Sequence, residues 1–67
     1  MSLMENFERN MLLMLKEKGI SQAELSKRIG VGKSTVNDWV HKHKEPSISN
    51  VYKIMKELNC TFEELVE

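Results

Sequence analysis

The polar residues best placed to do chemistry lie together in one short segment of the chain. Ser34, Asn37, Asp38 and His41 follow one another at helical spacing (i, i+3, i+4, i+7), with Lys33 just before them. Hydroxyl, amide, carboxylate and ammonium groups of these kinds form hydrogen bonds with base edges in the major groove of DNA. The solvated face of any surface helix would show the same spacing, so this interpretation depends on the neighbouring segments.

Other chemistries find little support in the residues. His41 and His43 have no third ligand at a spacing typical of metal sites. Cys60 is the only cysteine, which excludes an internal disulfide, and we interpret it as a small buried hydrophobic residue. No Ser/His/Asp or Cys/His arrangement and no phosphate-binding glycine loop is present. We therefore expect neither an enzyme nor a cofactor.

Apolar periodicity predicts an all-α chain. Apolar residues recur at helical spacing along the whole sequence, and no segment alternates as a strand would. The expected helices lie near 3–18, 22–29, 33–41, 48–58 and 62–66. We expect one domain over residues 1–67.

Helix-capping signals support these boundaries. Capping boxes are expected at SLME (2–5), SQAE (21–24) and TFEE (61–64), and Ser47 is expected to cap the fourth helix. Gly19, Gly30 and Asn59 stand where a left-handed residue would end a helix.

A glycine-containing hinge separates the second and third expected helices. Two short helices joined by a turn of three or four residues form a helix-turn-helix, here at about residues 21–41. Helices this short do not persist alone, so the longer helices must support them. Trp39 and Val36 share one side of the third helix, which favours the core for Trp39 over stacking on a base.

The charge distribution is uneven although the formal net charge is zero, which taken alone argues against a nucleic-acid-binding protein. Between Arg9 and Lys44 there are eight Lys and Arg residues against three acidic ones. The last eleven residues hold four glutamates and no basic residue. The sequence thus predicts a basic body and an acidic tail facing away from any DNA.

No apolar run approaches the ~18 residues of a membrane span, and no signal-peptide pattern is present. With its single cysteine, the chain is expected to be cytoplasmic and to make no membrane contact.

From about Met11 to Glu67 the sequence resembles the phage-repressor or Cro-like helix-turn-helix domains of the XRE type. The resemblance rests on three ordered stretches: GISQAELSKRIGVGKSTVNDW, KHKEPSISNVYKIM and LNCTFEELVE. It implies a compact five-helix, lambda-repressor-like bundle that binds double-stranded operator DNA, commonly as a homodimer, with the third helix in the major groove. The resemblance would make the chain a sequence-specific transcriptional regulator, a small repressor on a palindromic operator, with no small-molecule effector evident.

The resemblance also implies residue roles. Base-reading positions correspond to Lys33, Ser34, Asn37 and Asp38. Phosphate-contacting positions correspond to Gln22, Gly32, Lys42, Lys44 and Asn50, with Gly32 acting through its backbone alone. A dimer interface is expected near the last two helices, through Tyr52, Phe62 and Leu65, although these residues could instead close the monomer core.

Three departures from the family pattern stand out. Gly32 occupies a position where the family often has Ser or Thr. Leu15 and Val40 replace a basic and an acidic residue that often pair, so we expect these two side chains to touch. Lys42 replaces a common glycine, which favours a third helix running through His41.

A different class of function stays open on the same fold. A protein-interaction module, such as an antitoxin or anti-repressor component, would bind DNA weakly or not at all. Zero net charge, Asp38 on the reading face and Gly32 all lean this way.

Overall fold

In the computed structural model, which describes residues 4–67, the chain forms five α-helices and no strand. The helices are α1 (Phe7–Lys18), α2 (Gln22–Ile29), α3 (Lys33–Val40), α4 (Ile48–Leu58) and α5 (Phe62–Val66). The all-α fold class is confirmed. Four of the five expected helices lie within one residue of the expected bounds at each end, and the first begins later than expected.

The expected caps form at most helix ends. Ser21 Oγ accepts a hydrogen bond from the Glu24 N–H at 3.0 Å, and Ser47 Oγ accepts one from the Asn50 N–H at 3.2 Å. At α5 the reciprocal capping box of Thr61 is complete. The box at Ser21 is only half formed, since the Glu24 carboxylate accepts from Arg28 Nε at 3.2 Å instead. These caps satisfy backbone donors that the first turn of a helix leaves unpaired.

The start of α1 differs from the sequence prediction. The helix begins at Phe7, whose N–H donates to the carbonyl of Met4 at 3.1 Å in a turn. The expected capping box at 2–5 includes residues outside the described part of the chain. Asn6 stands at the N-cap without a side-chain cap, and its Nδ2 donates to the Glu67 carbonyl at 3.4 Å. The Asn6 side chain thus joins the start of α1 to the end of the chain and does not cap its own helix.

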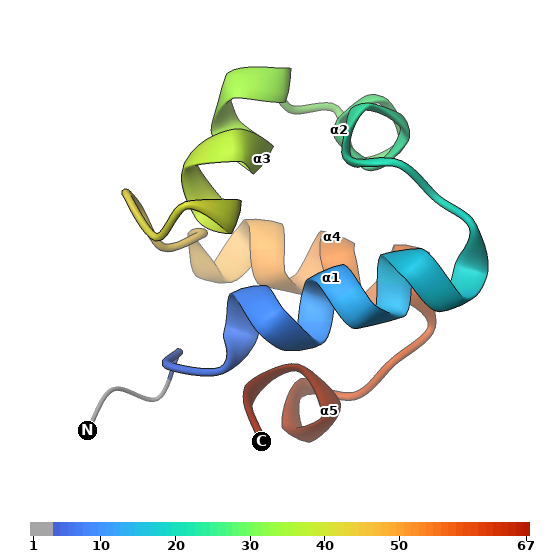
Figure 1. The fold of residues 1–67 in the computed structure, drawn as a ribbon, viewed down its shortest axis with the longest axis vertical. Coiled ribbons are helices and arrows are strands. Elements are labelled where there is room, and N and C mark those ends of the chain that lie inside the picture. Colours follow the sequence, from blue (N-terminus) through green and yellow to red (C-terminus); the bar gives the residue numbers. More distant parts are fainter. Residues whose placement is uncertain (1–3) are drawn as a thin grey trace.

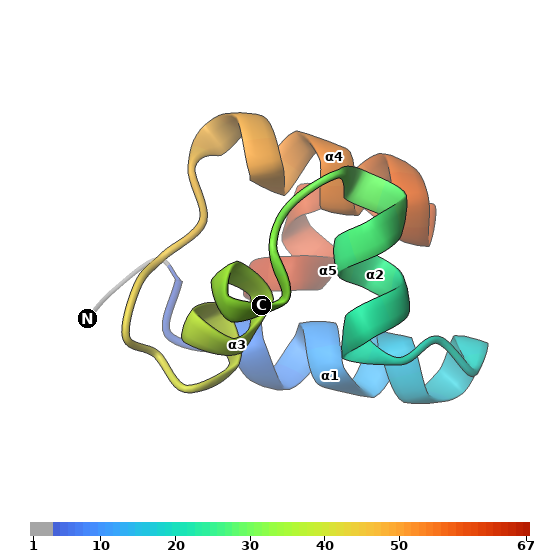
Figure 2. The same ribbon diagram turned by 90° about the horizontal axis from the view of Figure 1, so that it is seen from above.

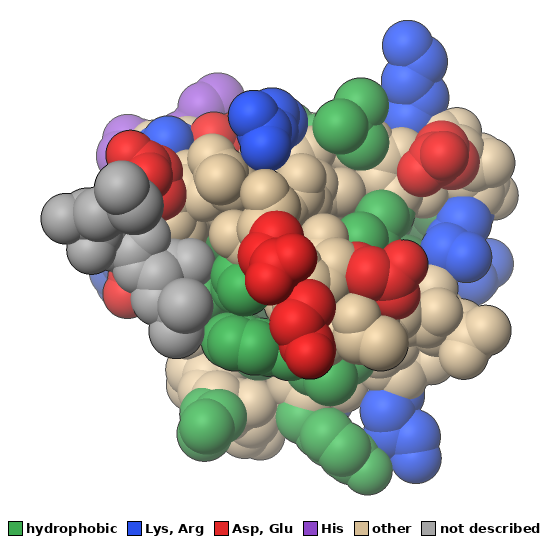
Figure 3. Space-filling view, turned by 90° about the horizontal axis from the view of Figure 1, so that it is seen from below, with side chains coloured by type: hydrophobic (Ala, Val, Ile, Leu, Met, Phe, Trp, Pro, Cys, Tyr) green, Lys and Arg blue, Asp and Glu red, His purple; other side chains and the backbone are tan. Residues whose placement is uncertain are grey.

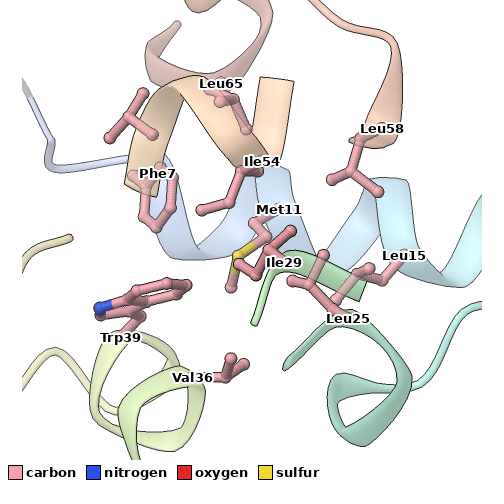
Figure 4. Close-up of a cluster of buried hydrophobic side chains, with 11 residues drawn as sticks. Phe7, Met11, Leu15, Leu25, Ile29, Val36, Trp39, Ile54, Leu58 and Leu65 are labelled. Atoms are coloured by element: carbon pink, nitrogen blue, oxygen red, sulfur yellow. The ribbon is translucent and has the colours of Figure 1, made fainter. Parts of the chain in front are cut away.

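One cluster of apolar side chains forms the core. Its buried members come from every helix: Phe7, Met11, Leu15, Leu25, Ile29, Val36, Trp39, Val51, Ile54, Leu58 and Leu65. Figure 4 shows Val36 and Trp39 reaching from α3 toward Met11. Leu15 is buried and Val40 packs half-buried against the cluster, so neither points into solvent, and their direct contact stays a prediction.

The two short helices sit at one end of the bundle. In Figure 1, α2 and α3 lie at the opposite end from α5. Figure 2 looks onto α2 and α3, with α1 along one side and α4 along the other. α2 packs against α3 and α4, and α1 packs against α3 and α5. The longer helices thus support the two short ones, as the sequence indicates. Across residues 4–67, none of the helices has the length and apolarity needed to cross a membrane.

Candidate nucleic-acid interface

α3 buries one face and leaves the other in solvent. Val36 is fully buried and Trp39 is 3% exposed, so the core position predicted for Trp39 is confirmed. Lys33, Ser34 and Asn37 on the opposite face are all exposed. The face that carries the predicted base-reading groups is therefore available to a partner.

The hinge before α3 uses its two glycines differently. Gly30 has a φ of 74°, a left-handed conformation that costs a side-chain-bearing residue free energy. Gly32 has a φ of −72° and a ψ of 153°, which any residue adopts. A Cβ added to Gly32 would lie 3.7 Å from Ser34 Oγ, an ordinary contact. The backbone thus favours glycine at position 30 but not at 32.

Because Gly32 has no side chain, α3 begins without a side-chain cap. α2, α4 and α5 each have a hydroxyl that accepts from the first turn. The uncapped first turn of α3 presents backbone N–H groups and the positive end of the helix dipole, which together favour an anion.

A hollow of about 260 Å³ joins the two short helices. Its walls are Gln22 and Ala23 at the start of α2, and Lys33, Ser34 and Asn37 on α3. The structure therefore brings one predicted phosphate contact together with three of the four predicted base readers. Among its lining residues, Gln22, Ser34 and Asn37 carry hydrogen-bonding groups and Lys33 carries an ammonium.

Asp38, the fourth predicted base reader, lies outside this hollow. Its carboxylate oxygen Oδ1 is 3.7 Å from His43 Nδ1, and the aspartate side chain is 32% exposed. Its backbone carbonyl accepts from the His43 N–H at 2.9 Å. Asp38 thus interacts with the loop that follows α3.

The end of α3 corrects one expectation. The helix ends at Val40, with His41 as the C-cap, and does not run through His41. Lys42 follows with a φ of 60°, the left-handed conformation that glycine adopts most easily. Lys42 therefore reverses the chain in a left-handed conformation, at a conformational cost, and the helix is not extended.

The predicted phosphate contacts after α3 have different environments. Lys42 Nζ lies 3.3 Å from Glu8 Oε1 on α1, so its charge is paired within the molecule. Lys44 is exposed, and Asn50, in the first turn of α4, is half-buried. Lys42 and Lys44 share a hollow of about 260 Å³ with the start of α1. These residues are not part of the α2–α3 hollow.

The residues proposed for a dimer interface separate into core and surface. Leu65 is fully buried in the monomer, which fits the alternative that it closes the monomer core. Tyr52 is 59% exposed and Phe62 is half-buried. Both line an apolar groove of about 450 Å³ between α4 and α5.

Sequence reasoning missed the most exposed member of this groove, Ile48, which is 89% exposed. The available signal was the width of the apolar stripe on α4. Val51, Ile54 and Leu58 are buried, whereas Ile48 and Tyr52 lie on a neighbouring stripe that the core does not cover. A stripe wider than the core requires indicates a second apolar face.

The acidic tail lies away from α3. Figure 3 views the molecule from the α5 side, where acidic side chains gather beside the apolar ones. Glu63, Glu64 and Glu67, all exposed, belong to this part of the chain. The charge asymmetry expected from the sequence thus has its acidic pole at the end opposite α3.

Metal and thiol chemistry have little basis in the side-chain arrangement. Over residues 4–67, no group of three or more His, Cys, Asp or Glu residues is placed to hold a metal ion. Burial raises the pKa of the Cys60 thiol, Glu64 raises it further, and Lys18 lowers it. The thiol is therefore protonated at neutral pH, as expected for a half-buried apolar contact.

An exposed helix held against a second helix across a tight turn defines the helix-turn-helix class of DNA-binding domains. The model of a helix-turn-helix family matches residues 12–65, most of the chain, and the chain belongs to this Cro-like, XRE-type family of DNA-binding transcriptional regulators. No curated protein and no solved structure matches the chain.

Proposed function

We propose that this chain is a sequence-specific repressor that binds a palindromic operator as a homodimer. The observation that carries the proposal is the hollow between α2 and α3, where Gln22, Lys33 and Asn37 converge. A major groove admits one α-helix, and the exposed face of α3 is of suitable size and chemistry.

Phosphate contacts would fix the position of the protein on the duplex. Gln22 stands at the start of α2, beside the uncapped N-terminus of α3, where Gly32 offers only its backbone. Lys44 would add a contact from the loop after α3, and Asn50 one from the start of α4. Contacts of this kind set register and orientation but carry little sequence information.

Base contacts would come from the exposed face of α3. Asn37 suits adenine, which presents both a donor and an acceptor in the major groove, and Lys33 suits the two acceptors of guanine. Ser34 can donate or accept, and Asp38 could accept from cytosine if it leaves His43.

One short helix offers few base contacts, so we infer that two copies bind together. The apolar groove of Ile48, Tyr52 and Phe62 is a suitable self-association surface, because exposed apolar patches of this kind mark interaction sites. A two-fold dimer would place its reading helices on half-sites about one helical turn apart.

A protein-interaction module on the same fold is the second candidate. It is favoured by the ion pair of Lys42 with Glu8, since this pair reduces the positive charge available to DNA. In that case the α4–α5 groove would be the main functional surface.

A binding selection separates the two candidates. The protein is mixed with a pool of random duplexes, bound DNA is recovered, and affinity for any enriched duplex is measured across a salt series. A regulator would enrich a palindromic sequence and lose affinity steeply with salt, since phosphate contacts release counterions. An interaction module would show no enrichment and no salt dependence, and this result would reject our proposal.

A further inference from the structure

The apolar groove of α4 and α5 continues into a basic surface at its α4 edge. Tyr52 lines both the groove and a neighbouring hollow of about 370 Å³ between α2 and α4. The charged residues that line this hollow are Arg28, Lys53, Lys56 and Glu57. Lys56 Nζ lies 5.5 Å from the centroid of the Tyr52 ring, a cation–π contact that holds the ammonium beside the groove.

The two lysines supply the positive charge of this edge. Arg28 lies 3.2 Å from Glu24 and 4.0 Å from Glu57, so its charge is engaged within the molecule. Even with both glutamates counted, three cations stand against two carboxylates, and the edge keeps a positive charge. Lys53 and Lys56 are exposed, and neither belongs to an ion pair among residues 4–67.

The opposite edge of the groove, formed by α5, is acidic. Phe62 lines the groove, and Glu63 lies about 100° further around the helix, on the side away from the buried Leu65. Glu63 and Glu67 are exposed, lie one helical turn apart and form no ion pair within residues 4–67. Figure 3 shows acidic side chains on one side of the apolar patch and a basic side chain at its opposite border.

We propose that a second copy of the chain occupies this groove with the two-fold axis running along it, so that the acidic α5 edge of each copy faces the basic α4 edge of the other. This inference rests on the homodimer of the proposed function and adds the orientation of the two copies.

The charges select this axis because a two-fold interface pairs one surface patch with itself. An axis along the groove exchanges its two edges, so that Lys56 faces Glu63 on both sides of the dimer. An axis across the groove would place each edge opposite its own kind. Opposite charges attract across an interface and like charges disfavour it, so the first arrangement is preferred.

The test measures the dimer dissociation constant by sedimentation equilibrium at low salt for the wild type and two charge-reversal variants. Lys56→Glu places a carboxylate opposite Glu63, and Glu63→Lys places an ammonium opposite Lys56. A charge pair near 4 Å in water is worth about fivefold, and the symmetry changes two pairs at once. Each variant should therefore self-associate about tenfold more weakly than the wild type, or weaker still.

An equimolar mixture of the two variants provides the sharpest comparison. In the mixed dimer the two reversed side chains face each other at one edge, and the original pair of Lys56 with Glu63 remains at the other. Resonance energy transfer between chains labelled at their amino termini should therefore show a mixed dimer about as tight as the wild-type dimer. Added salt should weaken this preference, since it screens exposed charges.

Lys16→Glu and Glu17→Lys are the matched controls. Both residues are exposed on α1 and line neither the groove nor the α2–α4 hollow. These variants change the net charge by the same amounts, and their dimer dissociation constants should stay close to that of the wild type. Circular dichroism establishes that each variant is folded.

The outcomes are distinguishable. If either charge-reversal variant self-associates as tightly as the wild type, or if the mixture is no tighter than its components, this orientation is overturned while the homodimer stands. An axis across the groove would give that result, because Lys56→Glu only exchanges one like-charge pair for another. A wild-type protein that stays monomeric, both free and on DNA, rejects the homodimer of the proposed function and this inference with it.

Discussion

Gly30 and Gly32, two residues apart in one hinge, have different physical roles. Gly30 is left-handed and reverses the chain, whereas Gly32 is extended and leaves α3 uncapped. The sequence predicts the first role from the position of Gly30 after an apolar pattern. It cannot show that position 32 tolerates a side chain, because that depends on the distances to Ser34 and Thr35 in the folded hinge.

Gly32→Ser should therefore stabilise the protein. The new hydroxyl can cap α3, which is worth a few tenths of a kcal/mol over glycine. Thermal denaturation would show a rise of about 1–3 °C for a chain of this size. Gly30→Ser is the matched control and should destabilise by about 1 kcal/mol, since serine would have to be left-handed. Equal changes in stability for Gly32→Ser and Gly30→Ser would contradict the different backbone roles of the two glycines.

Lys42→Gly should raise the folding stability of the protein while weakening its binding to DNA. Glycine relieves the left-handed lysine, a gain of about 1 kcal/mol, and loses an exposed ion pair worth less than that. We expect slightly higher stability by urea denaturation together with weaker DNA binding in a low-salt titration. A less stable variant would mean that the pair with Glu8 outweighs the backbone strain.

For each helix, the agreement between the predicted and the observed ends depends on how far apart in the sequence the interacting residues are. The ends of α2, α4 and α5 depend on caps a few residues away and were predictable. At the start of α1, Asn6 donates to the Glu67 carbonyl and does not cap the helix, a contact across most of the chain that no local pattern contains. The pairing of Asp38 with His43 was missed because it requires the loop after α3 to fold back.

Asn10→Ala should loosen α5 from α1. Asn10 Nδ2 donates to the Leu65 carbonyl at 2.9 Å in a part-buried position, and loss of such a bond costs about 1 kcal/mol. Hydrogen exchange should quicken at the amides of α5 more than at those of α2. Asn6→Ala removes a longer, exposed bond and should have a smaller effect. If exchange rates rise equally in all helices, the Asn10 hydrogen bond does not act specifically on α5.

At the scale of the whole molecule, α3 and the apolar groove of α4 and α5 are separate surfaces on one small bundle, since the α2–α3 hollow and the groove share no lining residue. The sequence predicts the first from its hinge and polar face. It leaves the second ambiguous, because Tyr52 and Leu65 follow the same apolar periodicity. Only packing distinguishes them, with Tyr52 in solvent and Leu65 in the core.

Tyr52→Glu should therefore weaken self-association without unfolding the monomer. The residue is 59% exposed, and a carboxylate there disfavours an apolar interface. Sedimentation should show a shift toward monomer, with the melting temperature nearly unchanged. Leu65→Ala, at a fully buried site, should instead cost about 2–5 kcal/mol of folding stability. A wild-type protein that is monomeric on DNA would contradict the dimer.

The most direct test of the central claim, that α3 reads base edges, compares sequences selected from a random duplex pool by three proteins. Lys33→Ala should change base preference at one position of each half-site, since the exposed Lys33 faces the α2–α3 hollow. Lys44→Ala should weaken binding to all duplexes alike and leave the preferred sequence as in the wild type. If Lys33→Ala selects the wild-type sequence with unchanged preference, α3 does not read DNA as proposed.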